Sequence, residues 1–269
     1  MAMDLRRRVA TAVLLLPPTV AVVLFAPTWA VAIVLAAVFG VAALEWAVLA
    51  GWAQGWRPWA YAAAVVATLG AAAYAGPWQM LVGRAYLGLA LAWWSFAAVL
   101  VCQRWLLARP AKLAAGLATL APSWVALVAL HRLPDGPWLM MLVLLLVWAA
   151  DVGAFFAGHR FGRTKLAPEV SPGKTWEGAV GGFALALLVA YAAALALGVA
   201  PLPLVAISAL AVAVSVVGDL TESLFKRQAG VKDSGALLPG HGGVLDRLDS
   251  LFAAAPVFLV GWLLVGGAR

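Results

Sequence analysis

A run of polar residues between positions 218 and 250 has the residue types and the spacing of a catalytic segment. Asp219, Ser223 and Lys226 stand at positions i, i+4 and i+7 of this run. If a helix continues through them, they share one face. A carboxylate, a hydroxyl and an ammonium on one face are groups that bind metal ions and phosphates, so this segment is the first candidate for chemistry.

Two further carboxylates, Asp246 and Asp249, lie three residues apart at the start of an apolar stretch. A helix there would turn both the same way and bring three carboxylates, counting Asp219, to one surface. Carboxylates held close together repel, and a divalent cation relieves the repulsion. Oxygen ligands without a Cys or His pair favour Mg²⁺ over zinc. The alternative is a set of ion pairs on a solvated loop with Lys226, Arg227, Lys232 and Arg247.

A glycine-rich turn, Pro239–Gly243, separates these two groups. Glycine permits positive φ and close backbone approach, and successive N–H groups in such a turn can form a nest for an anion. With basic residues nearby, phosphate is a natural guest for Gly242 and Gly243. His241 could bind that phosphate, move a proton or cap the turn. A plain tight turn is the alternative interpretation.

A second loop contains the string Gly173-Lys174-Thr175. It is not a P-loop, because Pro168 stands where that motif needs its first glycine and no strand is predicted before it. The loop remains a candidate phosphate contact, since Lys174 brings charge and Thr175 precedes the amino end of a predicted helix, where N–H groups lack partners. Ser171 belongs to the same string, and Glu177 is expected to cap the helix.

Two more carboxylates lie inside apolar stretches. Asp151 interrupts the stretch 138–157, and an ionisable residue within a membrane segment is a functional candidate by default. Glu45 lies near the end of the stretch 30–50. It could reach the interface or face a polar cavity, and the sequence assigns it no role.

The composition indicates the environment in which these groups operate. Hydrophobic residues make up 65% of the 269 residues and charged residues only 11%, against about 25% charged in a soluble domain. A soluble fold of this length could not hide so much apolar surface. The composition therefore excludes a soluble enzyme, a disordered chain and a nucleic-acid-binding protein, and it predicts an integral membrane protein that crosses the bilayer many times.

The fold class expected is all-α, with about nine transmembrane helices, because lipid offers the backbone no hydrogen-bond partners. A span needs about 20 apolar residues. The stretches that qualify are 9–26, 30–50, 59–76, 85–107, 113–130, 138–157, 178–198, 203–219 and 250–267.

The distribution of basic residues predicts the orientation. If the amino terminus is cytoplasmic, only Arg84, Arg132 and Arg269 of the 18 basic residues fall on the opposite side. Such an imbalance is typical of cytoplasmic loops. The carboxyl terminus then lies outside the cytoplasm.

The two halves of the chain differ in chemistry. Only Asp4, Glu45 and Asp135 of the 11 acidic residues precede position 150. We therefore expect residues 1–137 to be a transmembrane scaffold of about five helices. Residues 138–269 would be the catalytic region, with cytoplasmic motif loops at 158–177 and 220–249.

The spacing of the polar residues in the second half resembles the signature of the phosphatidate cytidylyltransferase family, the CDP-diacylglycerol synthases. The stretch from Asp151 through the 171–178 string also looks like that family, and the resemblance covers roughly residues 148–252. One departure is Gly173, where the family often has a second lysine. The matching signature residues are Ser223, Lys226, Arg227, Lys232, Asp233, Pro239, Gly240, His241, Gly242, Gly243, Asp246, Arg247 and Asp249.

The resemblance implies that CTP and phosphatidate react to give CDP-diacylglycerol and pyrophosphate. It also implies dependence on Mg²⁺, a second cation such as K⁺, a homodimer, and a site facing the cytoplasm at the cell's inner membrane. The metal ligands would be Asp219, Asp246 and Asp249, which also count as catalytic groups. Lys226 would be a further catalytic residue, which contacts a phosphate. Substrate would be bound by Asp151, Ser171, Lys174, Thr175, Ser223, Arg227, Lys232, His241, Gly242, Gly243 and Arg247.

Two rival functions come from different classes. A CTP-dependent polyprenol or dolichol kinase would transfer the γ-phosphate, and product analysis separates it from a cytidylyltransferase. A transporter of an anionic solute would place polar residues along several spans, whereas the first five predicted spans hold almost none.

The predicted orientation can be tested by cysteine labelling. Cys102 is the sole cysteine, so new cysteines are introduced in a Cys102→Ala background. A cysteine in the 158–177 or the 220–249 loop should react with an impermeant thiol reagent only from the cytoplasmic side, and one beside Asp135 only from the other side. Labelling of the two motif loops from opposite faces would contradict a shared site.

Overall fold

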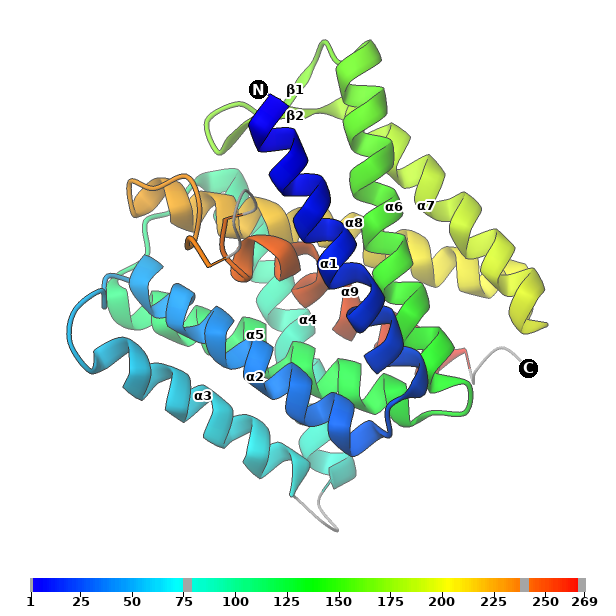
Figure 1. The fold of residues 1–269 in the computed structure, drawn as a ribbon, viewed down its shortest axis with the longest axis horizontal. Helices are drawn as coiled ribbons and strands as arrows, with labels where there is room; N and C mark the ends of the chain where they lie inside the picture. The colour runs from blue at the N-terminus through cyan, green and yellow to red at the C-terminus, as the bar shows by residue number, and fades with distance from the viewer. Residues whose placement is uncertain (1, 75–78, 238–241, 266–269) are drawn as a thin grey trace.

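The computed structural model describes residues 2–74, 79–237 and 242–265. The helices are α1 (Ala2–Phe25), α2 (Thr28–Leu49), α3 (Arg57–Ala73), α4 (Gln79–Gln103), α5 (Arg109–Arg132), α6 (Gly136–Phe161), α7 (Trp176–Leu197), α8 (Pro201–Gln228) and α9 (Leu245–Leu264). The strands β1 (Lys165–Ala167) and β2 (Ser171–Thr175) form a hairpin between α6 and α7 (Figure 1). The predicted all-α membrane fold is confirmed.

The count of nine spans is not confirmed. Within the described parts of the chain, seven helical segments are long and apolar enough to cross a membrane, and they belong to α2 and to α4 through α9. Helix α3 has 17 residues, and among the residues of α1 whose side chains are described the apolar segment is Val13–Phe25.

Several helices start and stop where their sequence signals predict. Proline stands in the first turn of α3, α5, α6 and α8. Backbone N–H groups in the first turn have no partner within the helix, so the N–H that proline lacks costs no hydrogen bond there. Helix α7 ends at Gly198, whose φ of 65° is the left-handed conformation of a common helix stop.

Helix α8 runs farther than the apolar stretch 203–219 indicated. It continues to Gln228, so the expected 220–249 loop is helical over its first residues. The extension carries buried Leu220, Leu224 and Phe225, and the Phe225 ring packs edge-on against Trp46 of α2 at 5.3 Å. Apolar contacts therefore keep this part of the chain on the protein, and Asp219, Ser223 and Lys226 do belong to one helix.

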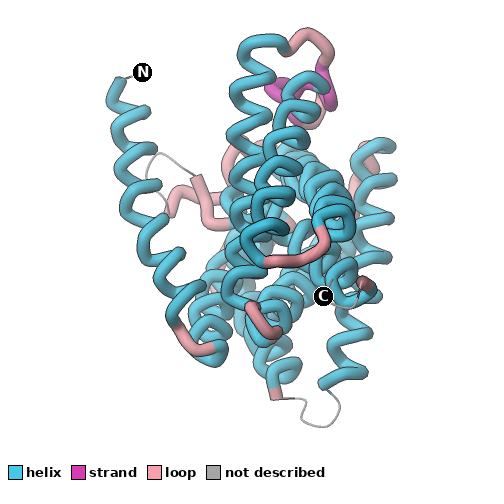
Figure 2. Tube along the Cα trace, turned by 90° about the vertical axis from the view of Figure 1, so that its right-hand side faces the viewer, coloured by secondary structure: helices cyan, strands magenta, loops and turns pink. Residues whose placement is uncertain are grey.

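Helices α6 and α7 pack closely because glycines line their contact. A Cβ at Gly153 would lie 2.6 Å from the Gly181 carbonyl oxygen, and a Cβ at Gly182 would collide with the Ala150 carbonyl oxygen. Small residues permit such an approach between membrane helices. This contact fixes the position of the β1–β2 hairpin, which joins the ends of the two helices (Figure 2).

The hairpin was not predicted from the sequence. Its strands are antiparallel, with Lys165 opposite Thr175 and Ala167 opposite Ser171. Strands of three and five residues are too short to show an alternating pattern. Arg227 at the end of α8 donates from Nε to the Val170 carbonyl oxygen at 3.3 Å, which places the hairpin beside α8.

The N-terminal half packs directly against the helices that carry the acidic residues. Phe39 of α2 contacts Phe252 of α9 with ring centroids 5.2 Å apart, and α5 and α9 are the most enclosed of the long helices. Helix α1 runs along the edge of the bundle (Figure 2). The two halves thus share one core.

The close α6–α7 contact gives a stability prediction. Gly182→Ala should lower the thermal midpoint of the detergent-solubilised protein, since overpacking typically costs about 1–3 kcal/mol. The control is Gly70→Ala in α3, where a Cβ meets nothing within 4 Å, and alanine should be neutral or stabilise the helix. Equal midpoints for the two variants would contradict the packing argument.

Candidate active site

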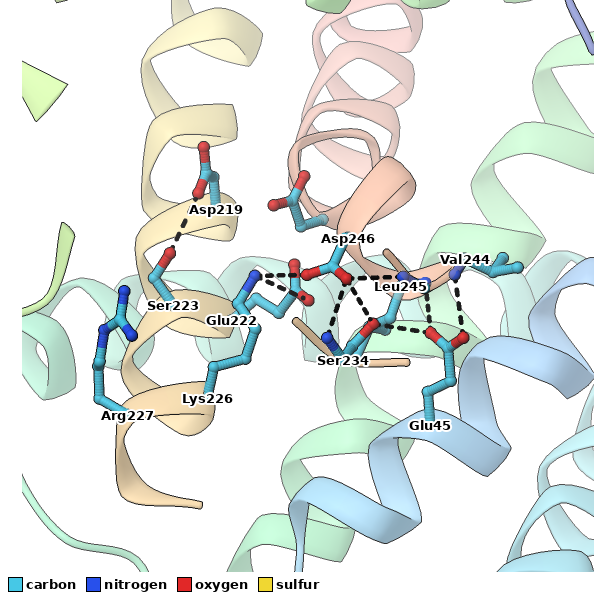
Figure 3. A network of polar contacts seen from close by, with 12 residues as sticks. Glu45, Asp219, Glu222, Ser223, Lys226, Arg227, Ser234, Val244, Leu245 and Asp246 are labelled. Carbon is cyan, nitrogen blue, oxygen red and sulfur yellow. Dashed lines mark hydrogen bonds and ion pairs between the residues drawn. The ribbon is translucent and has the colours of Figure 1, made fainter. Parts of the chain in front are cut away.

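Lys226 lies at the centre of a buried group of carboxylates (Figure 3). Its Nζ is 2.6 Å from Asp246 Oδ1 of α9 and 3.3 Å from Glu222 Oε1 of its own helix. The side chains of Lys226, Glu222 and Asp246 are only 12%, 3% and 6% exposed. The interpretation of Lys226 as an ion-pair partner on a solvated surface is therefore wrong.

Asp246 is held in one orientation by both of its oxygens. While Oδ1 receives Lys226, Oδ2 accepts hydrogen bonds from the backbone N–H of Ser234 at 2.9 Å and of Gly243 at 2.8 Å. Hydrogen bonds to a charged acceptor are the stronger kind. The Asp246 carboxylate is thus fixed by donors from α8, from the loop after it and from the turn before α9.

The described part of the glycine-rich turn, Gly242 and Gly243, lies against the carboxylate of Asp246. The N–H of Gly243 donates to Asp246, and Gly242 has a φ of 81° that favours glycine. A Cβ at Gly242 would lie 2.6 Å from Asp246 Oδ2. The predicted anion nest therefore receives an aspartate in this structure. His241 lies outside the described residues.

A second ion pair involves Asp219, seven residues before Lys226 in α8. Asp219 pairs through Oδ2 with Lys174 of β2 and accepts a hydrogen bond from Ser223 through Oδ1 at 3.3 Å. Lys174 comes from the predicted 158–177 loop and Asp219 directly precedes the predicted 220–249 loop, whose Arg227 also bonds to Val170. The structure therefore brings the two predicted motif segments together.

Glu222 is a site residue that the sequence analysis did not select. Neither of its side-chain oxygens has a hydrogen-bond partner, and Lys226 is its charged neighbour. Glu222 and Asp249 line the same small void between α8 and α9. Its position three residues after Asp219 and four before Lys226 was a sequence signal, because such residues share a helix face.

A cavity of about 830 Å³ opens beside this group. Asp151, Lys174, Asp219 and Ser250 supply charged and polar groups to its lining. The remaining wall is mostly apolar and comes from α6, α7 and α8, with Phe155, Phe183, Val180, Val212 and Val216 among its residues. Asp151 thus faces a cavity shared with the predicted phosphate contacts of the hairpin.

The remaining hairpin candidates have structural partners. Thr175 caps α7, since its hydroxyl oxygen accepts from the Gly178 N–H at 3.1 Å. Glu177, the expected cap, instead accepts from the backbone N–H groups of Arg163 and Thr164, each at 3.1 Å. Ser171 lies at the other end of β2 and is not part of the cavity lining.

The other basic candidates are exposed. Arg227 donates to the hairpin backbone. Lys232, two residues before Ser234, and Arg247, next to Asp246 in the chain, have exposed side chains. Exposed cations around a recessed acidic centre leave room for an anionic ligand.

The predicted metal ligands Asp219, Asp246 and Asp249 do not form one cluster. Over the described residues, no group of three or more His, Cys, Asp or Glu side chains is arranged to hold a metal ion. Asp219 and Asp246 each bind a lysine instead, and Asp249 Oδ1 accepts from the Ser250 N–H at 2.6 Å.

Comparison with known proteins gives a family match over nearly the whole chain. A model of the cytidylyltransferase family matches residues 6–264. A protein of Pseudomonas aeruginosa named phosphatidate cytidylyltransferase is 47% identical over 267 residues, which cover 94% of this chain and 95% of that protein. A protein of the same name from Haemophilus influenzae is 42% identical over 63% of this chain and 65% of its own length.

The buried ion pairs predict how stability depends on charge at this site. Lys226→Met leaves Glu222 and Asp246 buried without their cation and should destabilise the protein by about 3–5 kcal/mol, the usual effect of breaking a buried pair. Adding Glu222→Gln should recover part of the loss, because it removes one unpaired charge. Thermal midpoints in detergent measure both effects, and an Lys226→Met variant as stable as wild type would refute the buried pairing.

Proposed function

The chain belongs to the cytidylyltransferase family, and we propose that it transfers CMP from CTP to phosphatidate, giving CDP-diacylglycerol and pyrophosphate. The relatives named above carry that activity in their names. The observation that carries the proposal is the cavity, whose mostly apolar wall meets charged groups at Lys174, Asp219 and Asp151. Such a cavity suits a lipid with a phosphate headgroup.

The reaction needs charge stabilisation more than it needs a catalytic base. A phosphate oxygen of phosphatidate, already ionised at neutral pH, forms a bond to the α-phosphorus of CTP. The bond from that phosphorus to the bridging oxygen breaks, and pyrophosphate leaves with the electron pair. Positive groups aimed at the phosphates lower the barrier, because charge shifts onto the leaving group in the transition state.

The lysines of the site are the groups best placed for this task. A lysine ammonium has three N–H donors, so Lys226 can keep its bond to Asp246 and still donate to a phosphate oxygen. The same holds for Lys174 beside Asp219. Exposed Lys232 and Arg247, together with Ser223, would complete the binding of the two anionic substrates.

Magnesium belongs to the proposal on the chemistry of its donors. Mg²⁺ is usually bound by one or two carboxylates, several waters and substrate phosphates, and seldom by protein groups alone. Asp219, Asp246 and Asp249 are separate oxygen donors, so one or two of them could bind the ion together with a substrate phosphate. When bound, the ion would neutralise phosphate charge. Asp219 and Asp246 each pair with a lysine ammonium, so in the proposal the ion would share these carboxylates with the two lysines.

The proposal places this chemistry at the cytoplasmic surface of the membrane. CTP is dissolved in the cytoplasm and phosphatidate lies in the bilayer, so the site must be open to both. The excess of basic residues in the motif loops supports that orientation, and a homodimer is part of the same proposal.

A product analysis tests the proposal. Purified protein given phosphatidate, Mg²⁺ and CTP labelled at the α-phosphate should form a labelled lipid, whereas a lipid kinase would label the lipid only from γ-labelled CTP. Nucleotide-independent anion flux into sealed vesicles, without a labelled lipid, would favour a transporter.

Removing the charge of Asp246 should abolish most of this activity. We expect Asp246→Asn to lower the rate by at least about 10²-fold, the usual effect of losing an electrostatic element of a catalytic site. The matched control is Glu169→Gln on the hairpin, a carboxylate that is 69% exposed in its pair with Arg104 and should keep most of the activity. Near wild-type turnover by Asp246→Asn would rule out its proposed role.

A further inference from the structure

Glu45 brings a carboxylate from the N-terminal half of the chain to the beginning of α9. Its Oε1 accepts from the Val244 N–H at 3.0 Å, and its Oε2 accepts from the Leu245 N–H at 2.8 Å. Oε2 also accepts from the Ser234 hydroxyl at 2.8 Å (Figure 3). A residue of α2 is thus bonded to the loop after α8 and to the first residues of α9.

These bonds supply what the sequence of α9 lacks. The residue at its N-cap is Val244, which makes no side-chain capping bond. The first N–H groups of a helix have no intrahelical partners, and that end carries a partial positive charge. The Glu45 carboxylate satisfies two of these groups and is itself stabilised there, so it caps α9 from another helix.

The loop closes around Glu45 on two sides. A Cβ at Gly235 would lie 2.5 Å from Glu45 Oε1, and a Cβ at Gly243 would collide with both Glu45 Oε2 and the Ser234 hydroxyl. Any larger residue at either position would displace the carboxylate. Gly235 and Gly243 therefore allow the backbone to approach the Glu45 carboxylate closely.

Ser234 connects Glu45 to Asp246. Its hydroxyl is 2.8 Å from Glu45 Oε2 and 3.0 Å from Asp246 Oδ2, and its N–H donates to the same Asp246 oxygen at 2.9 Å. A hydroxyl has one proton to donate. Because Asp246 Oδ2 already receives the N–H groups of Ser234 and Gly243, the hydroxyl proton is best used by Glu45.

We propose that Glu45, through Ser234 and the start of α9, is a positioning residue that holds Asp246 in place against Lys226. Its catalytic effect rests on the proposed function, but the positioning itself does not. Glu45 bonds to Ser234 and to the start of α9, which are the same segments that hold Asp246, so its effect on the reaction would pass through Asp246. Misplacing a catalytic group by about 1 Å can lower a rate about 10²-fold.

Hydrogen exchange tests the positioning without any need for activity. Glu45→Gln keeps the size of the side chain but turns an NH₂ group toward a donor. If Glu45 positions Asp246, the variant should accelerate amide exchange about tenfold or more at Ser234 and Gly243, as well as at Val244 and Leu245, because local opening frees them all. The Ser234 and Gly243 amides bond to Asp246 and not to Glu45, so their exchange reports the transmitted effect. Faster exchange confined to Val244 and Leu245 would make Glu45 a local cap and overturn the proposal.

The matched control lies on the same helix. Thr28→Val removes the contact of the Thr28 hydroxyl with His131 Nδ1, 2.9 Å long, near the other end of α2. It should leave exchange in the 231–237 and 242–247 segments unchanged. If it accelerates them as much as Glu45→Gln does, the effect is a general loosening of α2 and the proposal fails.

A double-mutant cycle tests the catalytic consequence. Glu45→Gln alone should lower kcat for CDP-diacylglycerol formation by about 10- to 10²-fold, with the KM for CTP changed much less. In an Asp246→Asn background, adding Glu45→Gln should lower kcat by less than about threefold. A residue that acts through Asp246 has little further effect once the Asp246 carboxylate is gone. Multiplied losses would show that Glu45 acts independently of Asp246.

The two arms separate the possible failures. If the wild-type protein forms no CMP-bearing lipid, the proposed function fails while hydrogen exchange still decides the positioning. If the lipid forms and Glu45→Gln changes neither exchange nor kcat, the proposed function stands and the role of Glu45 is refuted.

Discussion

The ion pair between Lys226 and Asp246 is the interaction on which the rest of the site depends. It joins α8 to α9 in a place from which water is largely excluded, with both side chains less than about one-eighth exposed. A buried charge of either sign requires its partner, so the two helices must meet at this point. The backbone N–H groups of Ser234 and Gly243, which lie between the two helices in the chain, donate to Asp246 Oδ2 and hold its carboxylate beside that lysine.

The proposed function requires one site to bind both a lipid and a dissolved nucleotide, and the same arrangement is suited to that. The α6–α7 contact, made possible by glycines, supports a hairpin that carries Lys174 to Asp219. Between these helices and α8 lies a cavity with charged groups in one part of its lining and apolar side chains in the rest. Phosphate oxygens need charged or hydrogen-bonding partners, whereas acyl chains need apolar ones. The lining of this cavity contains both kinds of side chain.

The N-terminal half contributes more than a scaffold. Rings of α2 pack against α8 and α9, and Glu45 of the same helix bonds to the residues around Asp246. On sequence alone, the chain divides into a scaffold, residues 1–137, and a catalytic region, residues 138–269, because only three of the 11 acidic residues precede position 150. That count assigned no role to Glu45, whose bonds to Ser234 and Leu245 appear only in the tertiary structure.

The sequence by itself determined the membrane fold class, because the apolar content leaves no soluble alternative, and it identified the motif residues, because Asp219, Ser223 and Lys226 share a helix face by spacing alone. It also indicated the family, through the order and gaps of its polar residues. Only the tertiary structure decided which carboxylate each lysine binds, that Glu222 lies buried beside Lys226, and that Glu45 caps a helix 199 positions farther along the chain. Periodicity reports which residues of one helix face the same way. The partner across a helix contact is set by how the helices pack, and that information is spread over the small residues and rings of the whole core.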